Sequence, residues 1–193
     1  MKLAILVPTY EKWEPEFGYS LALLMAHLAR SDIQGVKLVR CDATNISESR
    51  NVLARDAIES EFSHMLWLDT DMKFTATDIQ SLIDRDVDFV GVNYLKRNPP
   101  HVPLALDLSD KRITEGSGLV RVSQVGFGVV LLKTSIFKKI PEPWFNFLWR
   151  EGQDDQIGED TWFCRTAVEK GVELYVDLDV HVGHIGKTIF TWR

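Results

Sequence analysis

The chain has 193 residues, 45% of them apolar, which is enough to bury a sizeable core within one domain. Acidic residues outnumber basic ones by 28 to 22, which argues against nucleic acid as a partner of the molecule as a whole. Any anionic ligand must therefore be held locally. The two cysteines, Cys41 and Cys164, lack the C-x-x-C spacing of a zinc framework and suit a reducing compartment.

The first apolar run, residues 3–7, predicts a buried strand that ends at Pro8. It is too short for the core of a signal peptide and far too short to span a bilayer. We therefore expect a cytoplasmic protein without a transmembrane segment, while peripheral contact with a membrane stays open.

Strands and helices alternate through the first half of the chain. The expected elements are a strand at 3–7, a helix around 21–28, a strand at 36–41, a helix at 45–60, a strand from 64 to Asp69, a helix at 75–83 and a strand at 87–94. This alternation predicts a mostly parallel sheet with right-handed crossovers and helices on both faces. Ligands of such sheets lie at the carboxyl ends of the strands.

The pattern changes after residues 98–100. Shorter strands are expected at 104–108, 119–122 and 129–132, separated by polar turns that contain glycine. A helix at 160–170, closed by Gly171, leads into a strand at 174–176 and a tail that contains histidines. This half is mixed α+β in character.

A D-x-D pair, Asp69 and Asp71, ends the long apolar strand in the middle of the alternating half. The same spacing occurs four times in the chain, so context must choose between the copies. Residues 84–88 fit a solvated turn, and Asp177 with Asp179 stays ambiguous. Only the pair at 69 and 71 is expected where strand ends converge on a ligand crevice.

Two carboxylates this close repel each other unless a cation lies between or before them. A hard divalent ion such as Mg²⁺ or Mn²⁺ would be held by them together with phosphate oxygens of a substrate. Chance remains a competing explanation of the pair. The aspartyl phosphatases use a D-x-D as well, but they require Thr two residues after the second Asp, where this chain has Lys73.

Four stretches, taken together and in order, resemble the nucleotide-sugar glycosyltransferases of the GT-A fold, in particular family 2-like members. They are "ILVPTY" (5–10), "SESRNVLARDA" (47–57), "LWLDTDM" (66–72) and "GEDTWFCRTAVEKGVELYVDLDVHVGHIG" (158–186). The resemblance implies an α/β, Rossmann-like single domain over residues 1–193. Residues 1–98 would form the nucleotide-binding half and residues 99–193 the acceptor and catalytic half.

For the metal, the resemblance makes Asp71 the direct ligand and places Asp69 near both the ion and the ribose. The histidine ligand of the family matches His184 in "GHIG", with His181 in reserve. An imidazole ligand suits Mn²⁺, with Mg²⁺ as the alternative ion. A surface or packing role for these histidines is the competing interpretation.

An inverting transferase needs a general base for the acceptor hydroxyl. By the resemblance this base is Asp160, in the acidic pair that opens a helix, and Glu159 could share the role. Acidic residues are also favoured at a helix N-terminus by the helix dipole, whatever else they do.

The nucleotide contacts also follow from the resemblance. Arg50 suits phosphate or uracil recognition, although a surface salt bridge with Glu48 or Asp56 is an alternative. The remaining candidates are Pro8, Thr9, Tyr10, Asp42, Asp69 and Lys187. Lys187 fits a solvated lysine equally well.

The acceptor is unreadable from the sequence, because residues 95–128 depart most from the pattern of the family. Residues 142–156 crowd aromatic rings before the acidic pair. Such rings suit the apolar faces of sugars, but core packing explains them as well. They are Trp144, Phe145, Phe147 and Trp149.

The leading hypothesis is a divalent-metal-dependent, hexosyltransferase-type enzyme that moves a sugar from a UDP- or GDP-sugar to a glycan, lipid-linked or other hydroxyl acceptor. Inversion is expected, and retention stays open. A nucleotidyltransferase is the rival enzyme, but it would carry a Gly-rich basic loop where residues 8–13 read "PTYEKW". A non-catalytic sugar-nucleotide or glycan-binding module of the same fold is the third hypothesis.

Overall fold

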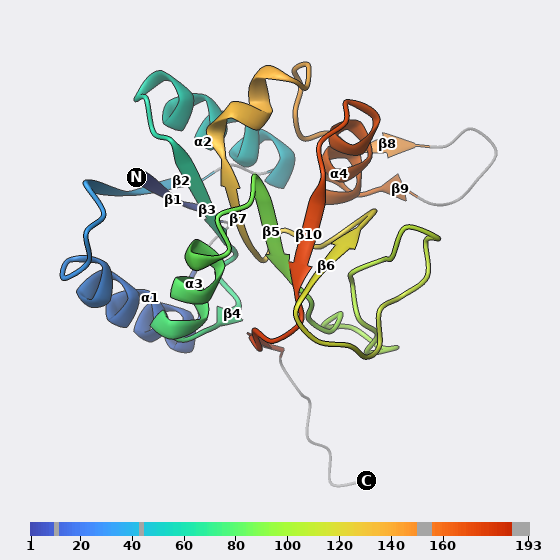
Figure 1. Ribbon diagram of the computed structural model, residues 1–193, viewed down its shortest axis with the longest axis horizontal. Helices are drawn as coiled ribbons and strands as arrows, with labels where there is room; N and C mark the ends of the chain where they lie inside the picture. The colour runs from blue at the N-terminus through green and yellow to red at the C-terminus, as the bar shows by residue number, and fades with distance from the viewer. Residues whose placement is uncertain (10–11, 43–44, 150–155, 187–193) are drawn as a thin grey trace, which may run out of the picture.

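A seven-stranded sheet forms the centre of the computed structural model, which describes residues 1–9, 12–42, 45–149 and 156–186 (Figure 1). The strand order is β2-β1-β3-β7-β5-β10-β6. Their bounds are β1 Lys2–Thr9, β2 Gly35–Asp42, β3 His64–Leu68, β5 Phe89–Val92, β6 Leu119–Val122, β7 Val129–Lys133 and β10 Leu174–Asp177. Two further pairs lie outside this sheet: β4 (Met72–Lys73) with β11 (Gly183–His184), and β8 (Leu148–Trp149) with β9 (Gln156–Ile157).

The sheet is mostly parallel, as the alternating pattern predicts. Strands β2, β1, β3, β5 and β10 run in one direction, whereas β7 and the edge strand β6 run against their neighbours. Strand β7 lies between β3 and β5, and its Leu131 pairs with both Leu66 and Val90. A strand from the second half of the chain is therefore inserted among those of the first half.

Helices cover both faces of the sheet (Figure 1). Side chains of α1 (Pro15–Leu28) and α3 (Ala76–Asp84) pack in one apolar cluster, and those of α2 (Ile46–Glu59) and α4 (Glu159–Glu169) pack in the other. The 3₁₀ helix η1 (Thr134–Lys138) joins the second cluster. Strand β1 divides its residues by alternation, with Ile5 in the first cluster and Leu6 in the second. The predicted α/β class, with helices on both faces, is confirmed.

Local signals placed several helix ends correctly. The Asn45 side chain caps α2 by accepting a hydrogen bond from the Ser47 amide. Thr75 and Asp78 form a reciprocal capping box at the start of α3. Gly171, at φ +75°, ends α4 in the left-handed region that favours glycine.

The expected strand at 104–108 is wrong. Its backbone makes only isolated bridges, in which Leu106 faces both Arg112 and Gln124. The first strand also continues past Pro8 to Thr9. Proline is tolerated there because pairing with β3 stops at Leu6, so the missing amide of Pro8 faces no ladder on that side.

In the part of the chain that the structure describes, no helix combines the length and apolarity needed to cross a membrane.

Candidate functional site

A tight turn follows β3 and carries the D-x-D pair. The Asp69 amide donates to the Gly128 carbonyl, and the Met72 amide donates back to the Asp69 carbonyl. Because the turn comes directly after β3, the two carboxylates lie at the carboxyl end of a central strand. The turn then leads into β4. Parallel sheets bind their ligands at this edge.

The tail of the chain returns to this turn. Strand β11 pairs with β4, placing His184 opposite Met72, and the Ile185 amide donates to the Asp71 carbonyl at 2.8 Å. Nε2 of His184 lies 3.3 Å from Oδ2 of Asp71. The structure therefore brings together two residues that lie 113 positions apart in the chain.

The orientation of the His184 ring is fixed on two sides. Its Nδ1 lies 2.8 Å from the Leu95 carbonyl, which can only accept, so Nδ1 carries a proton. The ring also meets the Tyr94 ring edge-on at a centroid distance of 5.2 Å. The hydrogen bond with Asp71 raises the pKa of His184. In the neutral ring the lone pair of Nε2 faces the Asp71 carboxylate, which is the arrangement of a metal-binding histidine.

The Asp71 and His184 pair fits two positions of one divalent ion. An ion bonded to both atoms at about 2.1–2.2 Å would bring them within 3.3 Å of each other at an angle of about 100°. Among the described residues, no group of three or more His, Cys, Asp and Glu side chains is placed to hold a metal. The remaining positions would fall to substrate oxygens and water, as is usual for ions shared with phosphates.

Arg97 contacts the same carboxylate. Its Nη1 lies 2.7 Å from Asp71 Oδ2. Burial acts to raise the pKa of Asp71, but the hydrogen bond from His184 and the charges of His184 and Arg97 outweigh it and hold that pKa below its usual value. Asp71 is therefore held toward its ionised form by Arg97 and His184.

Arg50 lies beneath the site and is fully buried, with 2% of its side chain exposed. Its Nη2 donates to Asp69 Oδ1 at 2.8 Å, and its Nε donates to Glu159 Oε1 at 3.2 Å. Its guanidinium carbon lies 5.4–5.9 Å from the ring centres of Trp67, Phe127 and Phe145.

The alternative of a surface salt bridge for Arg50 is wrong. The side chain lies in the interior, and Asp56 pairs with Lys37 instead. Nη1 of Arg50 is buried without a hydrogen-bond partner among the described residues.

Burial raises the pKa of Asp69 to about 6, with contributions from the charges of Asp71 and Glu159, and the Arg50 charge only partly offsets them. Three carboxylates, two from the turn after β3 and one from the start of α4, therefore share one small region. The guanidinium of Arg50 is what allows two of them, Asp69 and Glu159, to lie within a few ångströms of each other.

The acidic pair opens α4, as the sequence predicts. Oδ1 of Asp160 accepts a hydrogen bond from the Thr161 amide at 2.6 Å. Burial and then the charge of Glu159 raise the pKa of Asp160, although the bond from Thr161 and the charge of Arg50 oppose them. A carboxylate with a raised pKa is better matched to proton transfer near neutral pH than an ordinary Asp.

The residues assigned to the nucleotide are only partly described. Pro8 and Thr9 are buried at the end of β1, and Thr9 Oγ1 accepts from Trp13 Nε1 while donating to the Val7 carbonyl. Asp42 ends β2, but its side chain lies outside the described part of the structure. Tyr10 and Lys187 lie outside the described residues altogether.

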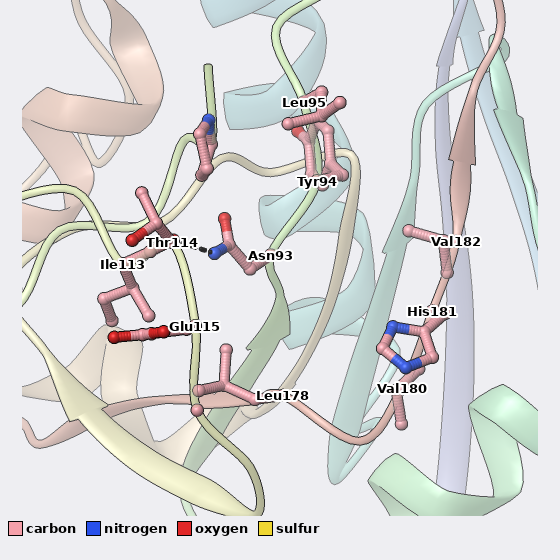
Figure 2. A pocket seen from close by; sticks show the side chains of 12 residues that line it. Asn93, Tyr94, Leu95, Ile113, Thr114, Glu115, Leu178, Val180, His181 and Val182 are labelled. Atoms are coloured by element: carbon pink, nitrogen blue, oxygen red, sulfur yellow. Dashed lines mark hydrogen bonds between the residues drawn. The ribbon is translucent and has the colours of Figure 1, made fainter. Parts of the chain in front are cut away.

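The reserve histidine, His181, occupies a different place. It lines a hollow of about 280 Å³, into which Glu115 and Leu178 also face (Figure 2). His184 instead lines a cleft of about 1030 Å³ together with Arg97, Lys96 and His101. Of the two histidines, only His184 contacts Asp71 in the structure.

The remaining acidic and aromatic candidates separate clearly. Asp177 is fully buried and binds Arg85 through both carboxylate oxygens, so that D-x-D copy has a structural partner. Trp144 and Phe145 belong to the core, whereas 67% of Trp149 is exposed. The first two rings therefore contribute to packing, Phe147 is half-buried, and Trp149 is the most exposed ring of the four.

Sequence reasoning missed Tyr94 and Arg97. The Tyr94 hydroxyl accepts the Gly128 amide at 2.9 Å. It lies so close that a Cβ at Gly126 or Gly128 would approach it to 2.5–2.6 Å. The "GFG" turn was the available signal for Tyr94, since paired glycines mark a close approach. Arg97 fell in the segment whose pattern was unreadable, and no signal pointed to its contact with Asp71.

Comparison with solved structures identifies the architecture. A197 from STIV aligns over 100% of this chain and 98% of its own, with a TM-score of 0.63 and 14% identity. GalNAc-T7 with UDP, GalNAc and Mn²⁺ aligns over 95% of this chain and 44% of its own, with a TM-score of 0.60 and 11% identity. A Drosophila β1,4-galactosyltransferase 7 mutant with manganese, UDP-Gal and xylobiose aligns over 96% and 71%, with a TM-score of 0.59 and 16% identity.

The chain has a GT-A-like fold. At these sequence identities the similarity establishes the fold alone, because proteins that share one fold can have unrelated activities. No family model matches the sequence, and no curated protein matches it significantly. The function is therefore inferred from the residues of the site itself.

Proposed function

We propose that the protein is a divalent-metal-dependent glycosyltransferase that moves a sugar from a nucleoside diphosphate sugar to an acceptor hydroxyl, with inversion. The observation that carries the proposal is the bridge made by Arg50 between Asp69, beside the ion-binding candidate Asp71, and Glu159, beside the base candidate Asp160. Donor-side and acceptor-side groups thus belong to one site.

The donor side of the proposed site must balance negative charge. Cleavage of the sugar–phosphate bond leaves a nucleoside diphosphate whose negative charge must be neutralised as it develops. Asp71 and His184 would hold Mn²⁺ or Mg²⁺, which supplies this neutralisation as a Lewis acid when bound. Two structural neighbours contain UDP or UDP-Gal together with manganese, which supports a UDP-sugar as the first donor to test.

On the acceptor side, the proposed general base is Asp160. Thr161 engages Oδ1, so the other carboxylate oxygen takes the proton of the attacking hydroxyl in the proposed reaction. The raised pKa of Asp160 fits this role. The hydroxyl attacks the anomeric carbon from the side opposite the leaving diphosphate, so one displacement inverts the configuration. Glu159, bound to Arg50, keeps its position and shapes the local charge.

The first experiment is a thermal-shift panel of nucleoside diphosphates with and without Mn²⁺, followed by assays of donor hydrolysis and transfer. We expect one diphosphate to stabilise the protein only when the metal is present. Asp71→Ala should lose both this stabilisation and turnover. Asp160→Asn should keep the stabilisation and lose about 100-fold or more in turnover. Glu169→Gln, at the far end of α4, is the matched control.

Other outcomes would replace the proposal. Release of pyrophosphate instead of a nucleoside diphosphate would assign a nucleotidyltransferase. Stabilisation without turnover, for every donor and acceptor tried, would assign a binding module. Product with a retained anomeric configuration in the NMR spectrum would remove the role of Asp160 as the base.

A further inference from the structure

One oxygen of Asp71 is contacted by both Arg97 and His184. Arg97 Nη1 lies 2.7 Å from Oδ2, and His184 Nε2 lies 3.3 Å from the same atom. The ion of the proposed function would be bonded to Oδ2 of Asp71 and to Nε2 of His184. The guanidinium of Arg97 therefore engages the same carboxylate oxygen that the ion would use.

We propose that Arg97 is an exchangeable internal cation, which neutralises Asp71 in the metal-free protein and moves to the donor diphosphate when a divalent ion binds. This inference rests on the proposed function, because it assigns Arg97 a role in binding the same donor. It makes Arg97 a phosphate-binding residue and gives the Asp71 carboxylate a cationic partner while no ion is bound.

The exchange follows from charge and space. A carboxylate oxygen that binds an ion at about 2.1–2.2 Å cannot keep a guanidinium on the same lone pairs, and the two cations would repel each other. A nucleoside diphosphate on the ion provides new anionic oxygens nearby. A guanidinium binds such oxygens with two parallel hydrogen bonds, so Arg97 gains a better partner than it loses.

The surroundings of Arg97 permit this movement. Its side chain is 51% exposed, so no core packing holds the guanidinium at Asp71. It lines the cleft of about 1030 Å³ to which Lys96, His101 and His184 contribute basic groups and Glu14 one acidic group, so a released guanidinium stays beside an open and mostly basic space. Such a cleft is suited to a diphosphate.

Gly186 provides an independent observation. A Cβ at this position would lie 3.1 Å from Cγ and 3.6 Å from Cδ of Arg97. The missing side chain thus leaves room for the stem of Arg97 to cross the tail of the chain and reach Asp71. A methyl group at residue 186 would press on that stem and disfavour the contact without removing the guanidinium.

The test measures two affinities that the exchange moves in opposite directions. Isothermal titration gives the Kd of Mn²⁺ for the protein alone, and then the Kd of UDP and of GDP at saturating Mn²⁺. Arg97→Ala should bind Mn²⁺ about three- to tenfold more tightly, because the competing cation is gone. The same variant should bind the preferred diphosphate about tenfold more weakly, because a charge-assisted contact is lost.

Matched variants separate the steps. Gly186→Ala should tighten Mn²⁺ binding as well but keep diphosphate affinity, since the guanidinium remains available. Arg121→Ala removes an equally exposed arginine whose partner is Glu173, and it should change neither affinity. Asp71→Asn should abolish the Mn²⁺ signal. The melting temperature of each variant checks its folding, and Arg97→Gln replaces Arg97→Ala if the latter aggregates.

The inference and the proposed function fail in different ways. If the wild type binds Mn²⁺ through Asp71 but Arg97→Ala leaves that affinity unchanged or weakens it, Arg97 does not compete and the inference is overturned. If Arg97→Ala tightens Mn²⁺ binding without loss of diphosphate affinity, the transfer to the donor is overturned. If Mn²⁺ binds neither the wild type nor Arg97→Ala, the metal-dependent function itself fails, and the exchange fails with it.

Discussion

Only one residue separates the two carboxylates of the D-x-D turn, yet their arginine partners have opposite environments. Arg50, the partner of Asp69, is 2% exposed and packs among Trp67, Phe127 and Phe145. Arg97, the partner of Asp71, is 51% exposed and lines an open cleft.

This difference separates a fixed ion pair from an exchangeable one. Breaking a buried pair leaves an uncompensated charge in the interior, whereas an exposed pair contributes little to stability and is easily replaced. The Asp69 side of the turn is thus a permanent scaffold that holds Glu159 and the start of α4. In the exchange proposed above, the Asp71 side gives up its arginine for an ion.

The largest expected effect is on Arg50. Arg50→Met keeps the volume of the side chain but leaves Asp69 and Glu159 without their shared cation, so we expect the free energy of unfolding to fall by about 3–5 kcal/mol. Chemical denaturation measures this, with Arg121→Ala as an exposed control. A loss below about 1 kcal/mol would mean that the buried pair is not the scaffold described above.

Tyr94 tests the same scaffold from the other side of the turn. Tyr94→Phe removes the hydroxyl that accepts the hydrogen bond of the buried Gly128 amide. The carbonyl of Gly128 in turn accepts the hydrogen bond of the Asp69 amide. An unpaired buried donor costs about 1–3 kcal/mol, so stability should fall by that amount in the same denaturation assay. An unchanged midpoint would show that the hydroxyl is dispensable for the turn.

Arg97 should contrast with both. Without divalent ions, Arg97→Ala should reduce the free energy of unfolding by less than about 1 kcal/mol, because half of the side chain is exposed. A loss similar to that of Arg50→Met would erase the distinction between the two pairs.

The pH dependence of turnover sharpens the comparison further. Asp160 must be ionised to act as a base, so activity is lost as pH falls through its raised pKa. The Arg50 charge lowers that pKa, so Arg50→Met should move the acidic limb of the kcat/KM profile to higher pH. Arg97→Ala should leave this limb in place. A shift toward lower pH in Arg50→Met would contradict the assignment.

The sequence predicted what depends on neighbours along the chain. Asn45, Thr75 and Gly171 act on backbone groups within a few residues, so their helix ends could be read directly. The alternation of strands and helices in the first half likewise predicted the mostly parallel sheet and placed Asp69 at the end of a strand. Family resemblance, not local pattern, connected Asp71 with His184.

What the sequence could not provide depends on pairing across long separations. The insertion of β7 between β3 and β5 joins segments about 65 and 40 residues apart, and nothing local encodes the choice. The burial of Arg50 depends on Asp69 and on Glu159, which lies 109 positions away. Residues 104–108 have the apolar content of a strand, but their backbone bonds go to scattered loop partners, and only the folded chain reveals this.

The central claim is that Asp71 and His184 bind an ion that in turn binds the donor diphosphate. Its most direct test is the Kd of UDP and of GDP, measured by isothermal titration in excess Mn²⁺ and again after chelation of all divalent ions. The account predicts that Mn²⁺ tightens the binding of one of them by about tenfold or more in the wild type and not at all in Asp71→Ala. Equal affinity with and without divalent ions in the wild type would contradict it.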